Sequence, residues 1–258
     1  MRSKIDPKLG RRGFLRGVVA ATGAAPIARQ SLVVTGLVGA TVVAENRVGR
    51  AQTVGIGNFN LPGPEAGYQS LSPDEAGFVE AMVNVMCPAD SLTPSGVDCG
   101  LAVYIDRQLA GGFGKGERLY SRGPWMQGKP QHGYQLPLTP EQFFKAGVVA
   151  ADEAAQKRFG KRFSDLEPAD ADVFLHDLAD GKVTGTRVPL GQWFNELAYP
   201  LFVQACFADP IYGGNVGKVF WRMIGYPGLP ATHAQDMVKF RGKPYPGAKD
   251  PKSIADFS

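Results

Sequence analysis

The spacing of apolar residues along the chain predicts a series of amphipathic helices. The sequence Ser72-Pro73-Asp74-Glu75 combines an N-cap serine, a proline at the first helical position and a glutamate three residues after the cap. Apolar residues then recur at helical spacing, which predicts a helix over residues 73–87. Thr139-Pro140-Glu141-Gln142 repeats the capping pattern, and we expect its helix to continue towards Gly160.

Three further segments show the same periodicity and end near helix-breaking residues. They are residues 101–110, residues 168–179 and residues 190–207, the last of which we expect to be kinked by Pro200. The alternating pattern of strands is scarce. The sequence therefore predicts a mainly α fold: a single helical domain with long ordered loops at residues 111–138 and 208–232, too long to be mere connectors.

The first fifty residues indicate export. Arg11 and Arg12 are followed by Phe14, Leu15 and a long run of small and apolar residues, which resembles the twin-arginine signal of the bacterial Tat translocon. The alternative is a membrane anchor, but each apolar run is shorter than the roughly 20 residues that a spanning helix needs. We expect cleavage before Gln52, and hence a leader at residues 1–51, a linker at 52–71 and a helical domain with an extended C-terminal tail at 72–258.

The charge balance changes when this leader is set aside. Residues 1–51 hold nine basic and two acidic residues, so residues 52–258 carry 19 basic and 22 acidic residues. A net charge of −3 on the mature part argues against nucleic acid as a partner.

No motif for catalysis or cofactor binding emerges. The glycine-rich segments 112–116 and 212–218 depart from dinucleotide and phosphate-loop patterns, and we interpret the second as turns with positive φ. The chain has no C-x-x-C-H for haem attachment, and its three histidines are far apart in sequence. We therefore assign no catalytic, cofactor-binding or metal-binding residue to this chain.

The cysteines permit one disulfide if the protein is exported. Cys87 ends one predicted helix and Cys99 precedes the next, so a bridge would close the connection between them in an oxidising compartment. The alternative is two separately buried thiols. Cys206 is the odd cysteine, and we expect it in the core, with an intersubunit bridge as the alternative.

Several segments together resemble the gluconate 2-dehydrogenase subunit 3 family over roughly residues 70–235. They are Asp98-Cys99-Gly100, Val103 to Asp106, Gln108 to Gly112, Gly133-Tyr134-Gln135, Asp209 to Asn215 and Trp221 to Gly228. The resemblance implies the small, or gamma, subunit of a membrane-associated flavin dehydrogenase that oxidises a sugar, sugar acid or polyol. In such complexes a large subunit of the glucose-methanol-choline type holds FAD, and a multihaem cytochrome c subunit carries c-type haem.

For this chain the resemblance implies a non-catalytic role in the assembly and Tat co-export of the FAD subunit. It also implies a periplasmic location, peripheral to the inner membrane through the complex. Seven residues in the matching segments become candidates for the partner interface: Asp106, Tyr134, Gln135, Tyr212, Asn215, Trp221 and Tyr226. For each of them the alternative is a structural role, in which the side chain holds an irregular loop to its own domain.

Two other functions remain open at this stage. The chain could lend loop residues to the active site of the dehydrogenase. It could instead be a stand-alone periplasmic sugar-binding module, with exposed Trp125, Trp193 and Trp221 stacking on sugar rings.

Overall fold

The computed structural model describes residues 67–257, except 121–122, 125, 127, 130–131 and 231–232. All of them fall within one compact unit, Asn58–Ser258. The expected export signal of Arg11, Arg12, Phe14 and Leu15, with the rest of the leader, lies outside the described residues, as does Trp125.

The predicted mainly α fold is confirmed. The helices of the first part are α2 (Pro73–Met86), α3 (Leu101–Ala110), α4 (Pro140–Phe159) and α5 (Pro168–Ala179), followed by α6 (Leu190–Trp193) and α7 (Tyr199–Phe207). The described residues form no strand, and their single isolated bridge pairs Gly228 with Lys252. None of their helices is long and apolar enough to cross a membrane.

Both predicted capping boxes are formed. The Ser72 hydroxyl accepts a hydrogen bond from the Glu75 amide, and the Glu75 carboxylate accepts one from the Ser72 amide at 2.8 Å. Thr139 and Gln142 make the same exchange at the start of α4. Each box satisfies amide groups that the first helical turn leaves without a partner, which fixes where these helices begin.

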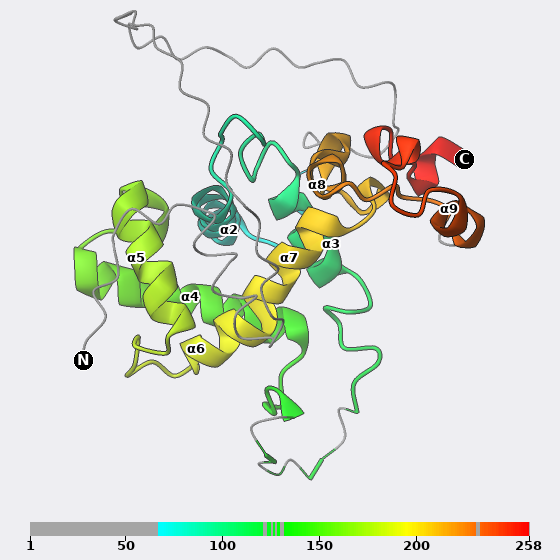
Figure 1. The fold of residues 1–258 in the computed structure, drawn as a ribbon. Coiled ribbons are helices and arrows are strands. Elements are labelled where there is room, and N and C mark those ends of the chain that lie inside the picture. Colours follow the sequence, from blue (N-terminus) through cyan, green and yellow to red (C-terminus); the bar gives the residue numbers. More distant parts are fainter. Residues whose placement is uncertain are drawn as a thin grey trace, which may run out of the picture. The chain divides into compact units, whose positions relative to one another are not determined.

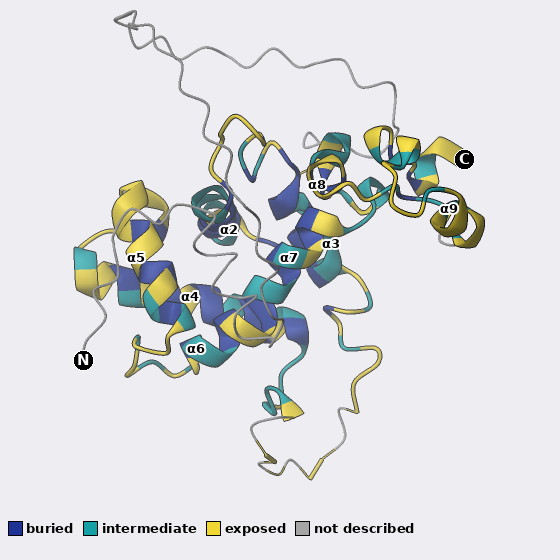
Figure 2. Cartoon of the chain, viewed as in Figure 1, coloured by how far each residue is buried: buried dark blue, intermediate teal, exposed yellow. Residues whose placement is uncertain are grey.

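Helix α2 lies at the centre of the core. It contacts α3, α4 and α5, and it buries Phe78, Val79, Met82 and Val83 against them (Figures 1 and 2). These side chains belong to one continuous cluster of buried apolar residues that extends from Leu71 to Phe220. Burial of such a cluster is the main favourable contribution to folding.

The segment 190–207 is helical throughout, but with a change of geometry before Pro200. Residues Phe194–Ala198 form a five-residue π-helical turn, η4, between α6 and α7. The Tyr199 amide bonds to the Phe194 carbonyl, five residues back instead of four. Because proline lacks an amide hydrogen and its ring crowds the preceding turn, the wider turn accommodates Pro200 without ending the helix.

The C-terminal part contains more structure than the sequence predicted. The expected loop 208–232 includes the short helix α8 (Val219–Ile224) and the 3-10 turns η5 (Pro210–Tyr212) and η6 (Val216–Lys218). The tail adds α9 (Ala234–Lys239) and the 3-10 turns η7 (Pro246–Lys249) and η8 (Ile254–Phe257), while η3 (Phe163–Asp165) follows α4. The short elements α8, α9 and η5 to η8 are too brief to show a helical period in the sequence.

Candidate partner-binding surface

Asp106 holds the entry to α2. Its carboxylate is buried on α3 and accepts hydrogen bonds from the amides of Gln69, Ser70 and Leu71 at 2.8, 2.8 and 2.9 Å. Three amide donors on one carboxylate fix the segment that leads directly to the N-cap Ser72. This geometry favours the structural role of Asp106, a loop clamp, over contact with a partner.

Tyr134 and Gln135 hold the loop that precedes α4. The Tyr134 ring packs on Phe143 with 4.5 Å between ring centroids, and burial raises the pKa of its hydroxyl. The Gln135 side-chain amide accepts a hydrogen bond from the Gly128 amide and donates one to the Lys129 carbonyl. Both side chains are half-buried and bind their own loop, so they leave little surface for a partner.

Asn215 organises the turn before α8. It is fully buried with φ at +49°, and its side chain bonds the Ala208 carbonyl and the Phe220 amide at 3.3 and 3.0 Å. Gly213, Gly217 and Lys218 also have positive φ, so the interpretation of segment 212–218 as left-handed turns is confirmed. The buried Asn215 is not accessible to a partner in this conformation.

Trp221 also faces the interior. Only 4% of it is exposed, its indole donates a hydrogen bond to the Phe207 carbonyl, and its ring contacts Tyr226 edge to face at a centroid distance of 5.0 Å. Trp193 is fully buried and donates to the Phe144 carbonyl at 3.1 Å. The expectation that Trp193 and Trp221 are exposed for sugar stacking is therefore wrong, because each ring is enclosed by the core and each N–H is bonded within the chain.

A set of apolar side chains is nevertheless exposed around α8. We call it the C-terminal apolar surface, and it consists of Tyr212, Val216, Met223, Ile224, Tyr226 and Phe257. The elements that carry these residues are in contact, since η5 contacts η6 and η8, and η6 contacts α8. Lys218 also pairs with Asp256, which joins η6 to the tail. Exposed apolar side chains gathered on adjoining elements are typical of protein interaction sites.

The sequence reasoning named only Tyr212 and Tyr226 from this surface. Met223 and Ile224 were missed because α8 was not predicted, and Phe257 because the tail showed no pattern. One sequence signal pointed to their exposure. Met223, Ile224 and Tyr226 stand close to Arg222, Gly225 and Gly228, so no long amphipathic helix could bury them.

The three cysteines are buried, and none of them takes part in a disulfide in the structure. Cys87 and Cys99 lie close together, because both sulfurs contact the Pro94 carbonyl oxygen, at 3.8 and 3.7 Å. A hydrogen bond with the Cys87 thiol, together with burial, raises the pKa of Cys99. No bond joins the two sulfurs here, and the bridge stays a prediction for the oxidised protein.

No group of three or more His, Cys, Asp or Glu side chains among the described residues is placed to hold a metal ion, and every buried polar side-chain atom described has a hydrogen-bond partner. The features that stand out among them are the hydrogen bonds of Asp106 and Asn215 within the chain and the C-terminal apolar surface.

These features define a small helical domain whose irregular loops are fixed from within and whose C-terminal elements present apolar side chains. Comparison with protein families identifies it further, since residues 73–228 match the model for gluconate 2-dehydrogenase subunit 3, and the chain belongs to that family. The match confirms the resemblance inferred from the sequence. The family description implies a subunit of a multisubunit gluconate dehydrogenase. Neither a comparison with curated proteins nor one with solved structures gave a match.

Proposed function

We propose that this chain is the non-catalytic small subunit of a periplasmic flavin-dependent sugar, sugar-acid or polyol dehydrogenase. It binds the FAD subunit, assists its assembly and carries it through the Tat translocon. FAD and c-type haem belong to partner subunits, the second to a multihaem cytochrome c that keeps the complex at the inner membrane. The observation that carries this proposal is the family match over residues 73–228, in a chain whose first residues resemble a twin-arginine signal.

The C-terminal apolar surface supports binding to a folded partner. Ile224 is 57% exposed and belongs to a helix whose other side buries Phe220 and Trp221 in the domain. Interfaces concentrate their energy in a few apolar and aromatic anchors, and such anchors are solvent-exposed in the free subunit. We therefore place the main contact with the FAD subunit on this surface, rather than on the buried Asp106, Asn215 or Trp221.

The export role is tested by replacing Arg11 and Arg12 with lysine. Both this chain and the FAD subunit should then stay in the cytoplasm, because the FAD subunit depends on the leader of this chain. Cell fractionation with antibodies against each subunit measures the outcome. Normal arrival of the FAD subunit in the periplasm would contradict co-export.

The binding role is tested by replacing Met223 and Ile224 with serine. We expect recovery of the FAD subunit in co-purification to fall at least about tenfold, since apolar anchors near an interface centre contribute 1 kcal/mol or more each. Val173→Ser is the matched control, because Val173 is 48% exposed on α5 and lies outside the C-terminal apolar surface. Equal recovery with both variants would place the contact elsewhere.

A further inference from the structure

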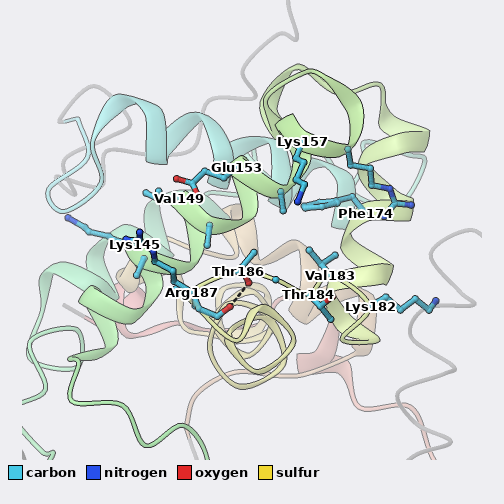
Figure 3. Close-up of a pocket in the computed structure, with 16 residues that line it drawn as sticks. Lys145, Val149, Glu153, Lys157, Phe174, Lys182, Val183, Thr184, Thr186 and Arg187 are labelled. Atoms are coloured by element: carbon cyan, nitrogen blue, oxygen red, sulfur yellow. Dashed lines mark hydrogen bonds between the residues drawn. The ribbon is translucent and has the colours of Figure 1, made fainter.

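A second surface of the domain forms a groove that the proposed function does not use. It lies between the outer side of α4 and the loop 182–188, and its volume is about 1070 Å³. Figure 3 shows Val149, Glu153 and Lys157 along α4 on one wall, with Val183 and Arg187 on the other. None of the residues that line it belongs to the C-terminal apolar surface.

The groove has apolar walls and a positive charge balance. Its apolar lining includes Val149, Ala150, Phe174, Val183 and Val188. The charged side chains in the lining are five cations and one carboxylate: Lys145, Lys157, Arg158, Lys182, Arg187 and Glu153.

Two of the five cations are available to a ligand. Arg158 and Lys182 pair with Asp177, and Lys145 pairs with Glu141. Lys157 and Arg187 are exposed and make no hydrogen bond or ion pair with any described residue. Lys157 belongs to α4 and Arg187 to the loop, so an acidic chain segment lying along the groove would meet a cation from each wall.

The loop wall also offers main-chain donors. No amide of residues 183–188 donates a hydrogen bond to a described residue, although the Thr186 hydroxyl bonds the Val188 carbonyl at 2.6 Å. Main-chain amides without an internal acceptor are groups that an extended peptide can use when it binds along a protein edge.

We propose that this groove binds an acidic segment of a partner protein that also carries apolar side chains. Acidic side chains would pair with Lys157 and Arg187, and apolar ones would cover Val149 and the walls around it. The leader of this chain does not fit, because its nine basic and two acidic residues would be repelled.

A chain segment also fits better than a small molecule or a membrane. Sites for small molecules have volumes of about 300–1,000 Å³ and bury most of the ligand, whereas Val149 in this groove is 53% exposed. A membrane surface needs a protruding apolar face, and here the apolar residues form the walls of a depression. The inference is separate from the proposed function, since it does not require the acidic segment to belong to the FAD subunit.

Photo-crosslinking in the full chain tests this assignment. A benzophenone amino acid replaces Val149 in cells that make the natural partners, and the crosslinked peptide is sequenced by mass spectrometry. The matched control carries the same group at Val173, which is exposed to a similar extent on α5 outside the groove. We expect the Val149 position alone to yield a partner peptide with more acidic than basic residues and with apolar residues between them.

Charge reversal supplies the second arm. Lys157→Glu with Arg187→Glu should lower the crosslink yield at Val149 at least about tenfold, because attraction becomes repulsion at both positions. Lys161→Glu with Lys243→Glu makes the same change of net charge outside the groove and should leave the yield unchanged. Circular dichroism confirms that each variant is folded.

Four outcomes would overturn the proposal. They are no crosslink above the Val173 control, a crosslinked lipid or small molecule, a crosslink to residues 1–66 of this chain, and a yield that the groove charge reversal does not change. Because co-purification of the FAD subunit is measured separately with the Met223 and Ile224 variant, failure of one inference is distinguishable from failure of the other.

Discussion

Residues 73–207 and residues 208–257 are stabilised in different ways. In the first region, helices of nine or more residues bury apolar faces, as α2 does with Phe78, Val79 and Met82, and capping boxes fix the starts of α2 and α4. In the second, short turns are held by single polar side chains such as Asn215, and apolar residues such as Ile224 stay exposed. We infer that the helical region provides most of the stability and the C-terminal region provides a surface. The fold of the C-terminal region depends on a few hydrogen bonds.

The largest effect should come from Asp106→Ala in the helical region. It leaves three amides in the segment before α2 without their acceptor, and we expect the free energy of unfolding to fall by about 3–5 kcal/mol. Urea unfolding followed by circular dichroism measures this. Gln108→Ala on the same helix is the control and should change stability by less than about 0.5 kcal/mol. A loss below about 1 kcal/mol for Asp106→Ala would show that the clamp is dispensable.

The cysteine pair offers the next largest effect. If Cys87 and Cys99 are bridged in exported protein, the closed loop should add about 3 kcal/mol to the free energy of unfolding, and a reductant should remove it. Cys87→Ser should abolish the effect of the reductant, while Cys206→Ser should preserve it. Alkylation of both Cys87 and Cys99 in non-reduced periplasmic material would refute the bridge.

In the C-terminal region, Asn215→Ala should act locally. The substitution removes both side-chain hydrogen bonds. It also leaves alanine, which has no polar side chain to stabilise the left-handed backbone, at φ +49°, and we expect a loss of about 2 kcal/mol of stability. Asn215→Gly keeps the backbone freedom and should cost about 1 kcal/mol. Hydrogen exchange should rise in residues 209–226 and stay unchanged in α2 to α5. Uniform loss of protection would mean that the two regions unfold together.

The smallest effect concerns Glu141, which joins α4 to two other segments. Burial opposes its ionisation, but hydrogen bonds from Lys115, Ser70 and Lys145 prevail and lower its pKa to about 2 from 4.5. A lowered pKa stabilises the fold above pH 4.5, and this contribution is lost as the pH falls from 4.5 towards 2. Because Lys115 is half-exposed, solvent weakens the ion pair, and we expect ionised Glu141 to contribute only about 1 kcal/mol to the free energy of unfolding.

Glu141→Gln should therefore reduce stability at pH 7 and match the parent protein near pH 2. The control is Glu153→Gln on the same helix, where the carboxylate has no ion pair with a described residue. An unchanged difference between parent and Glu141→Gln across this pH range would contradict the assigned ion pairs.

The sequence predicted the helical region well because its signals are local. Periodicity and terminal glycines placed α3 and α5 at their observed bounds, and a capping box helped to place α2 within one residue. The burial of Trp193 was not predicted, although Gly147 was a clue. A Cβ at Gly147 would lie 2.1 Å from the Trp193 indole nitrogen, so this glycine inside α4 marks the close approach of the ring.

The C-terminal region was predicted less well because distant contacts determine it. The Ile254 amide bonds the Asp209 carboxylate, and Leu229 pairs with Lys252, each across more than twenty residues. Such contacts leave no periodic signal. The candidate interface could be predicted as a region of the chain, but the separation of buried Trp221 from exposed Tyr226 required the structure.

The π-helical turn before Pro200 has a consequence for side-chain register. A regular α-helix turns about 100° per residue, so the extra residue in η4 rotates everything after it by that amount relative to α6. With this rotation, Leu201, Ala205 and Cys206 of α7 are buried while Phe207 is exposed. Removal of a single residue from η4 would turn the buried side of α7 away from α3. The extra residue thus acts as an angular spacer between the two halves of one helical segment.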